Sequence, residues 1–114
     1  MAKYKHRTTG NFNRVCSFLI NEILSTSSSA SLEDSEYMTR NNTNIAILVF
    51  ERYSYSGGNR LSLNVTIVED NGYIDIIGIS SGGSNGVFFK FNTMGEEFFL
   101  DKLRDAINKY EAQK

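Results

Sequence analysis

The chain has 114 residues, of which 40% are hydrophobic and 22% charged, and this composition predicts a single globular domain over residues 1–114. Its net charge of −1 argues against a protein that coats nucleic acid, since such proteins carry a basic excess. The only cysteine, Cys16, excludes an internal disulfide, and the longest apolar run, residues 45–50, is too short to span a bilayer. Because "MAKYKHRTTG" also lacks the apolar core of a signal peptide, we expect a cytoplasmic protein.

The first predicted elements are an edge strand and an amphipathic helix. Residues 2–8 alternate, with Lys3, Lys5 and Arg7 on one face, which is typical of an edge strand protected by charge. After Thr8-Thr9-Gly10, apolar residues recur every three or four positions, and we expect a helix with a threonine at its N-cap. Its apolar face consists of Phe12, Val15, Cys16, Leu19, Ile20 and Ile23. The serine-rich residues 25–31 predict a loop.

Five further strands are predicted between residues 32 and 91. The first, at 32–40, is polar, and its carboxylates at 33–36 are expected to be solvated. A turn of asparagines leads to residues 44–55, where both strand faces are apolar and both should be covered. Residues 60–70 alternate cleanly, and Asn71-Gly72 predicts a tight hairpin to 73–80, in which Gly78 suggests a bulge. The aromatic residues 87–91 predict a last short strand.

A second helix is expected from Thr93, which has capping-box spacing to Glu96. Its apolar stripe consists of Phe99, Leu103, Ile107 and Tyr110. The element order is therefore β-α-β-β-β-β-β-α. We predict a two-layer α+β domain, in which both helices pack on one face of a curled antiparallel β-meander.

Two segments resemble a known family. "ERYSYSGGNRLSLNVTI" and "SSGGSNGVFFKFNTMGEEFFLDKL" are similar to a small family of uncharacterised bacterial domains, found chiefly in Firmicutes and classified as a domain of unknown function. The likeness extends from "GNFNRV" to the final helix. It implies a single-domain bacterial protein and carries over no activity, cofactor or catalytic residue.

The glycine-rich stretch from Ser80 is the candidate binding site. It lacks the Gly-Lys pair of a phosphate-binding P-loop, and a strand rather than a helix is predicted to follow it. Two readings remain, a plain hairpin loop and a nest of backbone N–H groups that holds a small anion. Hairpin register places a guanidinium beside the glycines, as in an anion clamp. The ligand-binding candidates are Arg60, Gly82, Gly83, Ser84 and Asn85.

Other reactive residues have simpler interpretations. Arg52 should lie where its strand passes into solvent; facing the core, it would need a carboxylate partner or have to reach the rim. Cys16 lies on an apolar helix face and is expected to be a core residue. His6 is the only histidine, which argues against a Ser-His-Asp triad and a histidine-rich metal site. We therefore predict no catalytic residue, no metal and no cofactor.

Three functions compete. The first is a non-enzymatic interaction domain that forms a homodimer, because Ile45, Ile47 and Val49 occupy a sheet face that two helices on the other side cannot cover. The dimer is expected to use this face or the adjoining edge of the sheet. The second is a small-ligand or anion binder, which the element order suggests by analogy with helix-grip folds. The third, a hydrolase or transferase, lacks a suitable base. A filled core would favour the first of these functions, and a pocket above about 300 Å³ the second.

Overall fold

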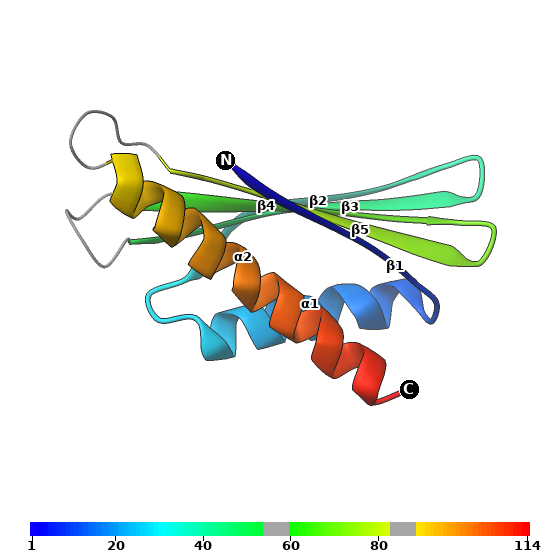
Figure 1. The fold of residues 1–114 in the computed structure, drawn as a ribbon. Coiled ribbons are helices and arrows are strands. Elements are labelled where there is room, and N and C mark those ends of the chain that lie inside the picture. The colour runs from blue at the N-terminus through cyan, green and yellow to red at the C-terminus, as the bar shows by residue number, and fades with distance from the viewer. Residues whose placement is uncertain (54–59, 83–88) are drawn as a thin grey trace.

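A computed structural model describes residues 1–53, 60–82 and 89–114, without the side chains of residues 89–94. The elements are β1 (Ala2–Thr8), α1 (Phe12–Thr26), β2 (Ser31–Arg40), β3 (Thr43–Tyr53), β4 (Arg60–Asp70), β5 (Tyr73–Gly82) and α2 (Phe89–Ala112). The five strands in these ranges form one antiparallel sheet in the order β1-β5-β4-β3-β2, and both helices lie on the same face of it (Figure 1). The predicted two-layer α+β fold is confirmed.

Two tight turns set the register of the β2–β3 and β4–β5 hairpins. Asn71 and Gly72 have φ values of 54° and 83°, and Asn41 and Asn42 have values of 50° and 70°. Positive φ at both central residues is the geometry of a type I′ turn, whose twist matches that of the flanking strands. The strands of each hairpin therefore pair from the first residue after the turn. The predicted turn at Gly57-Gly58 lies outside the described residues.

The core lies between the sheet and the two helices. β3 and β4 alternate as predicted, with every second side chain fully buried beneath the helices. The buried apolar residues of these two strands on that face are Ala46, Leu48, Phe50, Leu61, Leu63, Val65 and Ile67. The helices contribute Val15, Leu19, Ile23, Phe99, Leu103 and Ile107, among others. These side chains form one continuous cluster between the sheet and the helices.

The strand predicted at residues 87–91 is wrong where the structure describes it, because α2 begins at Phe89. The reason is topological. The expected place beside β5 is occupied by β1, which pairs with β5 from Ala2↔Ser80 to Thr8↔Ile74. With β1 on one side and β4 on the other, β5 has no free edge, and the strand preference of aromatic residues gives way to tertiary context. β1 is the edge strand that the alternation predicts.

The predicted capping residues also differ from those observed. Asn11 is the N-cap of α1 and accepts a hydrogen bond from the Arg14 backbone N–H at 2.9 Å. α1 then continues to Thr26, into the run predicted as a loop. In α2 the capping box at Thr93 is wrong because the helix starts earlier. Glu96 instead accepts a hydrogen bond from the Gly82 backbone N–H at 2.6 Å, so it joins the helix to the end of β5.

Gly78 does not mark a bulge, since the β4–β5 register runs unbroken from Leu61↔Gly82 to Asp70↔Tyr73. It faces α2, and a Cβ atom added there would lie 2.3 Å from Leu103 Cδ2. Gly78 therefore allows the helix to approach the sheet closely. The one register shift in the described strand pairs lies in β2, between Leu32 and Asp34.

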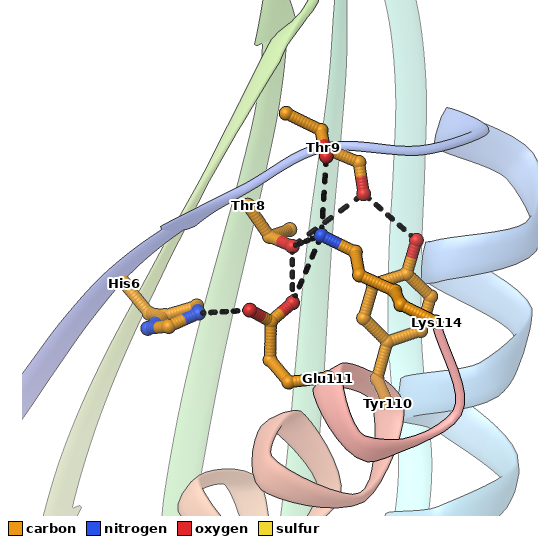
Figure 2. A network of polar contacts seen from close by, with 6 residues as sticks. All are labelled: His6, Thr8, Thr9, Tyr110, Glu111 and Lys114. Atoms are coloured by element: carbon orange, nitrogen blue, oxygen red, sulfur yellow. Dashed lines mark hydrogen bonds and ion pairs between the residues drawn. The ribbon is translucent and has the colours of Figure 1, made fainter.

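A polar network joins the C-terminal end of α2 to the end of β1 (Figure 2). The Thr8 hydroxyl donates to Glu111, and Lys114 Nζ donates to Thr8 Oγ1 at 2.6 Å and lies 3.1 Å from Glu111 Oε1. Tyr110 Oη donates to the Thr9 carbonyl at 2.9 Å. The Thr8 hydrogen bond, followed by Lys114 and His6, lowers the pKa of Glu111 despite its partial desolvation. The network holds the second helix across the edge strand.

Candidate functional site

No described element lies over the sheet face that points away from the helices (Figure 1). The alternation of β3 and β5 places apolar side chains on this face. Its aliphatic residues are Ile45, Ile47 and Val49 on β3, Val68 on β4, and Ile77 and Ile79 on β5. Ile79 is 39% exposed, and the flanking Tyr53 and Tyr73 are 54% and 52% exposed. We call this surface the open face. The structure confirms that β3 has two apolar sides, but the expectation that both would be covered is not met among the described residues, because the helices cover only one.

Strand register arranges the middle of the open face into two rows that cross the sheet from β1 to β2. One row consists of Lys5, Ile77, Thr66, Ile47 and Glu36. The next consists of Lys3, Ile79, Asn64, Val49 and Asp34. Each row has the same plan: a lysine on β1, an aliphatic residue on β5, a small polar residue on β4, an aliphatic residue on β3 and a carboxylate on β2.

The two ends of each row carry opposite charges that cannot meet within one chain. β1 and β2 are the two edges of the sheet, four strand spacings or about 19 Å apart. Arg7, on the same side of β1, pairs with Asp75, whose Oδ1 lies 2.8 Å from its Nε. Among the described residues no carboxylate lies within ion-pair distance of Lys3 or Lys5, although Lys5 is near enough to Asp75 to help lower the pKa of that carboxyl. The basic edge and the acidic edge are therefore both free to interact with another molecule.

A hollow of about 290 Å³ lies at the acidic end of the rows. It is lined by Asp34, Ser35, Glu36, Ile47 and Val49. Two carboxylates beside two aliphatic side chains match a lysine, whose stem is apolar and whose tip is cationic. The hollow thus gives the open face a concave acidic region opposite its basic edge.

Of the predicted anion site, the structure describes only Arg60 and Gly82. Gly83, Ser84 and Asn85 lie outside the described residues. Arg60 Nη2 lies 2.5 Å from Glu51 Oε1 and 3.6 Å from Glu33 Oε2, and its guanidinium stacks over Tyr53. The Gly82 N–H is bound by Glu96. Each of the two described members of the site therefore already has a carboxylate partner from the chain itself.

Arg52 differs from the prediction that its strand end enters solvent. Its side chain lies on the helix side of β3 and is 2% exposed. Arg52 Nη1 donates to Ser27 Oγ at 3.3 Å, and the guanidinium stands over the Phe99 ring at 5.1 Å. The alternation of β3 does not stop at Phe50, and it carries Arg52 into the layer between α1 and α2.

A second concave region lies on the helix side, where the hairpins extend past the N-terminus of α1. It has a volume of about 560 Å³. It is lined by Asn11, Phe12, Asn13, Tyr37, Met38, Thr39, Asn44 and Glu69. Asn44 Nδ2 donates to Glu69 Oε1 at 2.8 Å, and Thr39 donates to Asn44 Oδ1 at 2.7 Å. These bonds satisfy part of the groove's polar groups internally.

The sequence predicts the alternation of β1 and the polar character of β2, but it does not connect the charges of the two strands. The Asn41-Asn42 turn could have placed Glu36 opposite Ile47, since a two-residue hairpin fixes that register. Nothing local to residues 2–8 indicates that β1 pairs with β5, because the contact joins segments about 70 residues apart. The rows become visible only when both pairings are known.

A comparison with models of protein families matches most of the chain. A model described as a family of unknown function (DUF6054) covers residues 1–111. No curated protein matches the chain. None of the helices in the described ranges is long and apolar enough to cross a membrane.

Proposed function

The chain belongs to the family of unknown function DUF6054, and we propose that it is a non-enzymatic interaction domain that binds a second copy of itself through the open face. The observation that carries the proposal is the uncovered aliphatic cluster centred on Ile47 and Ile77, on well-formed central strands. The bacterial cytoplasm is the proposed setting. A single buried thiol, Cys16, suits such a reducing compartment.

The size of the open face supports self-association. Four of the strands have ten or eleven residues and β1 has seven. Five strands about 4.8 Å apart that rise about 3.3 Å per residue therefore cover an area close to 24 Å by 33 Å, or roughly 800 Å². A stable protein–protein interface buries about 800 Å² on each partner. The face is therefore large enough for one complete interface.

Sedimentation velocity over a range of concentrations tests this function. The chain has a mass of 12.9 kDa, and the wild type should sediment as a dimer in the micromolar range. Ile47→Asp should weaken dimerisation by at least about a hundredfold, since it places a charge in the apolar centre of the interface. Leu24→Asp is the matched control: Leu24 is 37% exposed on α1, in the other layer, and its replacement should leave the dimer intact. A wild type that stays monomeric at high concentration would contradict the proposal.

Small-ligand binding is the second candidate, and the groove of about 560 Å³ beside α1 favours it, because its size falls in the range of ligand sites. Anion binding by Arg60 and the glycine-rich loop remains part of this alternative. Titration with sulfate or phosphate, followed by backbone amide shifts, tests the anion site, with Arg60→Ala as the control. A ligand screen that shifts the amides of Asn13 and Thr39 would support the groove.

A further inference from the structure

Each of the two rows of the open face has the same order of residue classes from either edge of the sheet, except that the charged residues at its two ends have opposite signs. From β1 the first row runs from Lys5 through Ile77, Thr66 and Ile47 to Glu36, and from β2 it runs from a carboxylate through the same classes to a lysine. β4, the third of the five strands, is the centre of this pattern. A surface with this property is complementary to a second copy of itself.

Resting on the proposed function, we propose that the dimer is a β-sandwich whose two-fold axis runs parallel to the strands and passes over β4. Such an axis exchanges the two edges of the sheet. β1 of one copy then lies over β2 of its partner, and β4 lies over the partner's β4. A two-fold interface must be self-complementary, and this axis makes the open face so.

The contacts that follow are specific. Lys5 faces Glu36 of the partner subunit, and Lys3 faces Asp34 of the partner subunit. The aliphatic residues of β5 lie over those of β3, and Thr66 and Asn64 lie near their own symmetry mates, where a hydroxyl and an amide can hydrogen-bond to their copies. The lysines reach the hollow of about 290 Å³ between Asp34 and Val49, which offers both an apolar wall and carboxylates.

Sheet twist leaves this match intact at the centre. Aligned sheets in a sandwich cross at about 30°. Both rows lie near the middle of the strands, since β4 extends over Arg60–Asp70 and the rows meet it at Asn64 and Thr66. At the sheet edges the crossing offsets facing residues by about 5 Å, which a lysine side chain can span.

The competing face-to-face arrangement has its two-fold axis in the interface but perpendicular to the strands. That axis keeps each edge over the same edge of the partner. Lys3 and Lys5 would then face the partner's lysines, and the carboxylates of β2 would face carboxylates. Like charges in apposition oppose association, so the charges of the open face select the parallel axis.

Mixing two charge-reversed variants tests whether the charged edges of the two copies face each other, and mixing the basic-edge variant with wild type tests which axis relates the copies. The basic-edge variant is Lys3→Glu with Lys5→Glu, and the acidic-edge variant is Asp34→Lys with Glu36→Lys. Each variant alone places like charges over like charges, so its association constant for dimer formation should fall at least about tenfold. An equimolar mixture should restore a heterodimer, because every facing pair is then opposite in sign. Native mass spectrometry and sedimentation give the readout, and circular dichroism confirms that each variant is folded.

The outcomes separate the two proposals. A wild type that remains monomeric contradicts the proposed function and this inference together. A wild-type dimer with a mixture that does not associate overturns only the arrangement. Association of the basic-edge variant with wild type more tightly than wild type with itself would assign the perpendicular axis instead.

Where a double reversal does not fold, Lys5→Glu and Glu36→Lys serve as single-site versions. Wild-type dimerisation should also weaken between about 0.05 M and about 0.5 M salt, and salt independence would count against the facing charges.

Discussion

Cys16 lies on the buried side of α1 and is 2% exposed. Burial raises the pKa of its thiol to about 11, so that almost no thiolate forms at neutral pH. We expect the native protein to react with a disulfide reagent such as DTNB only through unfolding, at a rate far below that of a free thiol. The control is the same reaction in denaturant, which should be fast and stoichiometric. Rapid labelling of the native chain would contradict the buried position.

Gly78 allows α2 to lie close to the sheet, and its replacement by alanine should destabilise the fold. The added Cβ would meet Leu103 Cδ2 at 2.3 Å and Leu100 Cδ1 at 3.2 Å, inside a packed core. Overpacking of this kind costs about 1–3 kcal/mol of unfolding free energy. Urea unfolding measures the loss.

A double-mutant cycle isolates the cause of that loss. In a Leu103→Ala background the side chain that clashes is absent, so Gly78→Ala should cost much less than in wild type. Equal costs in the two backgrounds would show that the alanine acts through something other than this contact.

At the scale of elements, the end of α2 depends on the charge of Glu111. Its folded pKa lies below its ordinary value of 4.5, chiefly because the Thr8 hydroxyl donates to it. A carboxyl whose pKa is depressed on folding stabilises the native state above its unfolded pKa and loses that contribution as the pH falls through the folded pKa. We therefore expect stability to decline below about pH 4.5, and Glu111→Gln to reduce that decline. Thermal melts of both proteins across this pH range measure the difference.

A second carboxylate, outside this network, provides a control. Asp75 also has a lowered pKa, caused chiefly by its hydrogen bond with Arg7, but it lies on the open face, away from α2. Asp75→Asn should reduce the acid dependence as well, whereas only Glu111→Gln should speed amide exchange in the last turn of α2. Equal exchange in both variants would contradict the role of Glu111 in holding the helix end.

Local sequence signals predict the β3–β4–β5 meander well, but they do not predict the place of β1 or the structure that follows β5. Asn71-Gly72 fixes the β4–β5 register, and the alternation of residues 60–70 identifies the core face. The pairing of β1 with β5 has no such signal, because it is decided by which sheet edge remains free after the hairpins form. The wrong prediction of a strand at 87–91 has the same cause. Because the β1–β5 pairing is not visible in the sequence, an aromatic run after β5 cannot be distinguished from a further strand that pairs with it.

The candidate site shows the same division. Alternation predicts that Ile45, Ile47 and Val49 share a face, and the structure confirms it. The charge pattern of the open face combines a local pairing, β2 with β3, and a distant one, β1 with β5. Residues such as Lys5 and Glu36 therefore appear unrelated in the sequence, although they end the same row.

At the scale of the whole molecule, self-association should couple to folding. A partner that binds only the folded chain stabilises it by mass action, so the thermal midpoint of a dimer rises with protein concentration. We expect this rise in the wild type and in Leu24→Asp. Ile47→Asp should show a midpoint independent of concentration, because Ile47 points away from the core and its loss should affect the dimer rather than the fold. Differential scanning calorimetry over about a hundredfold range of concentration distinguishes these cases. A wild-type midpoint that does not move, in a protein that sediments as a dimer, would mean that dissociation does not accompany unfolding.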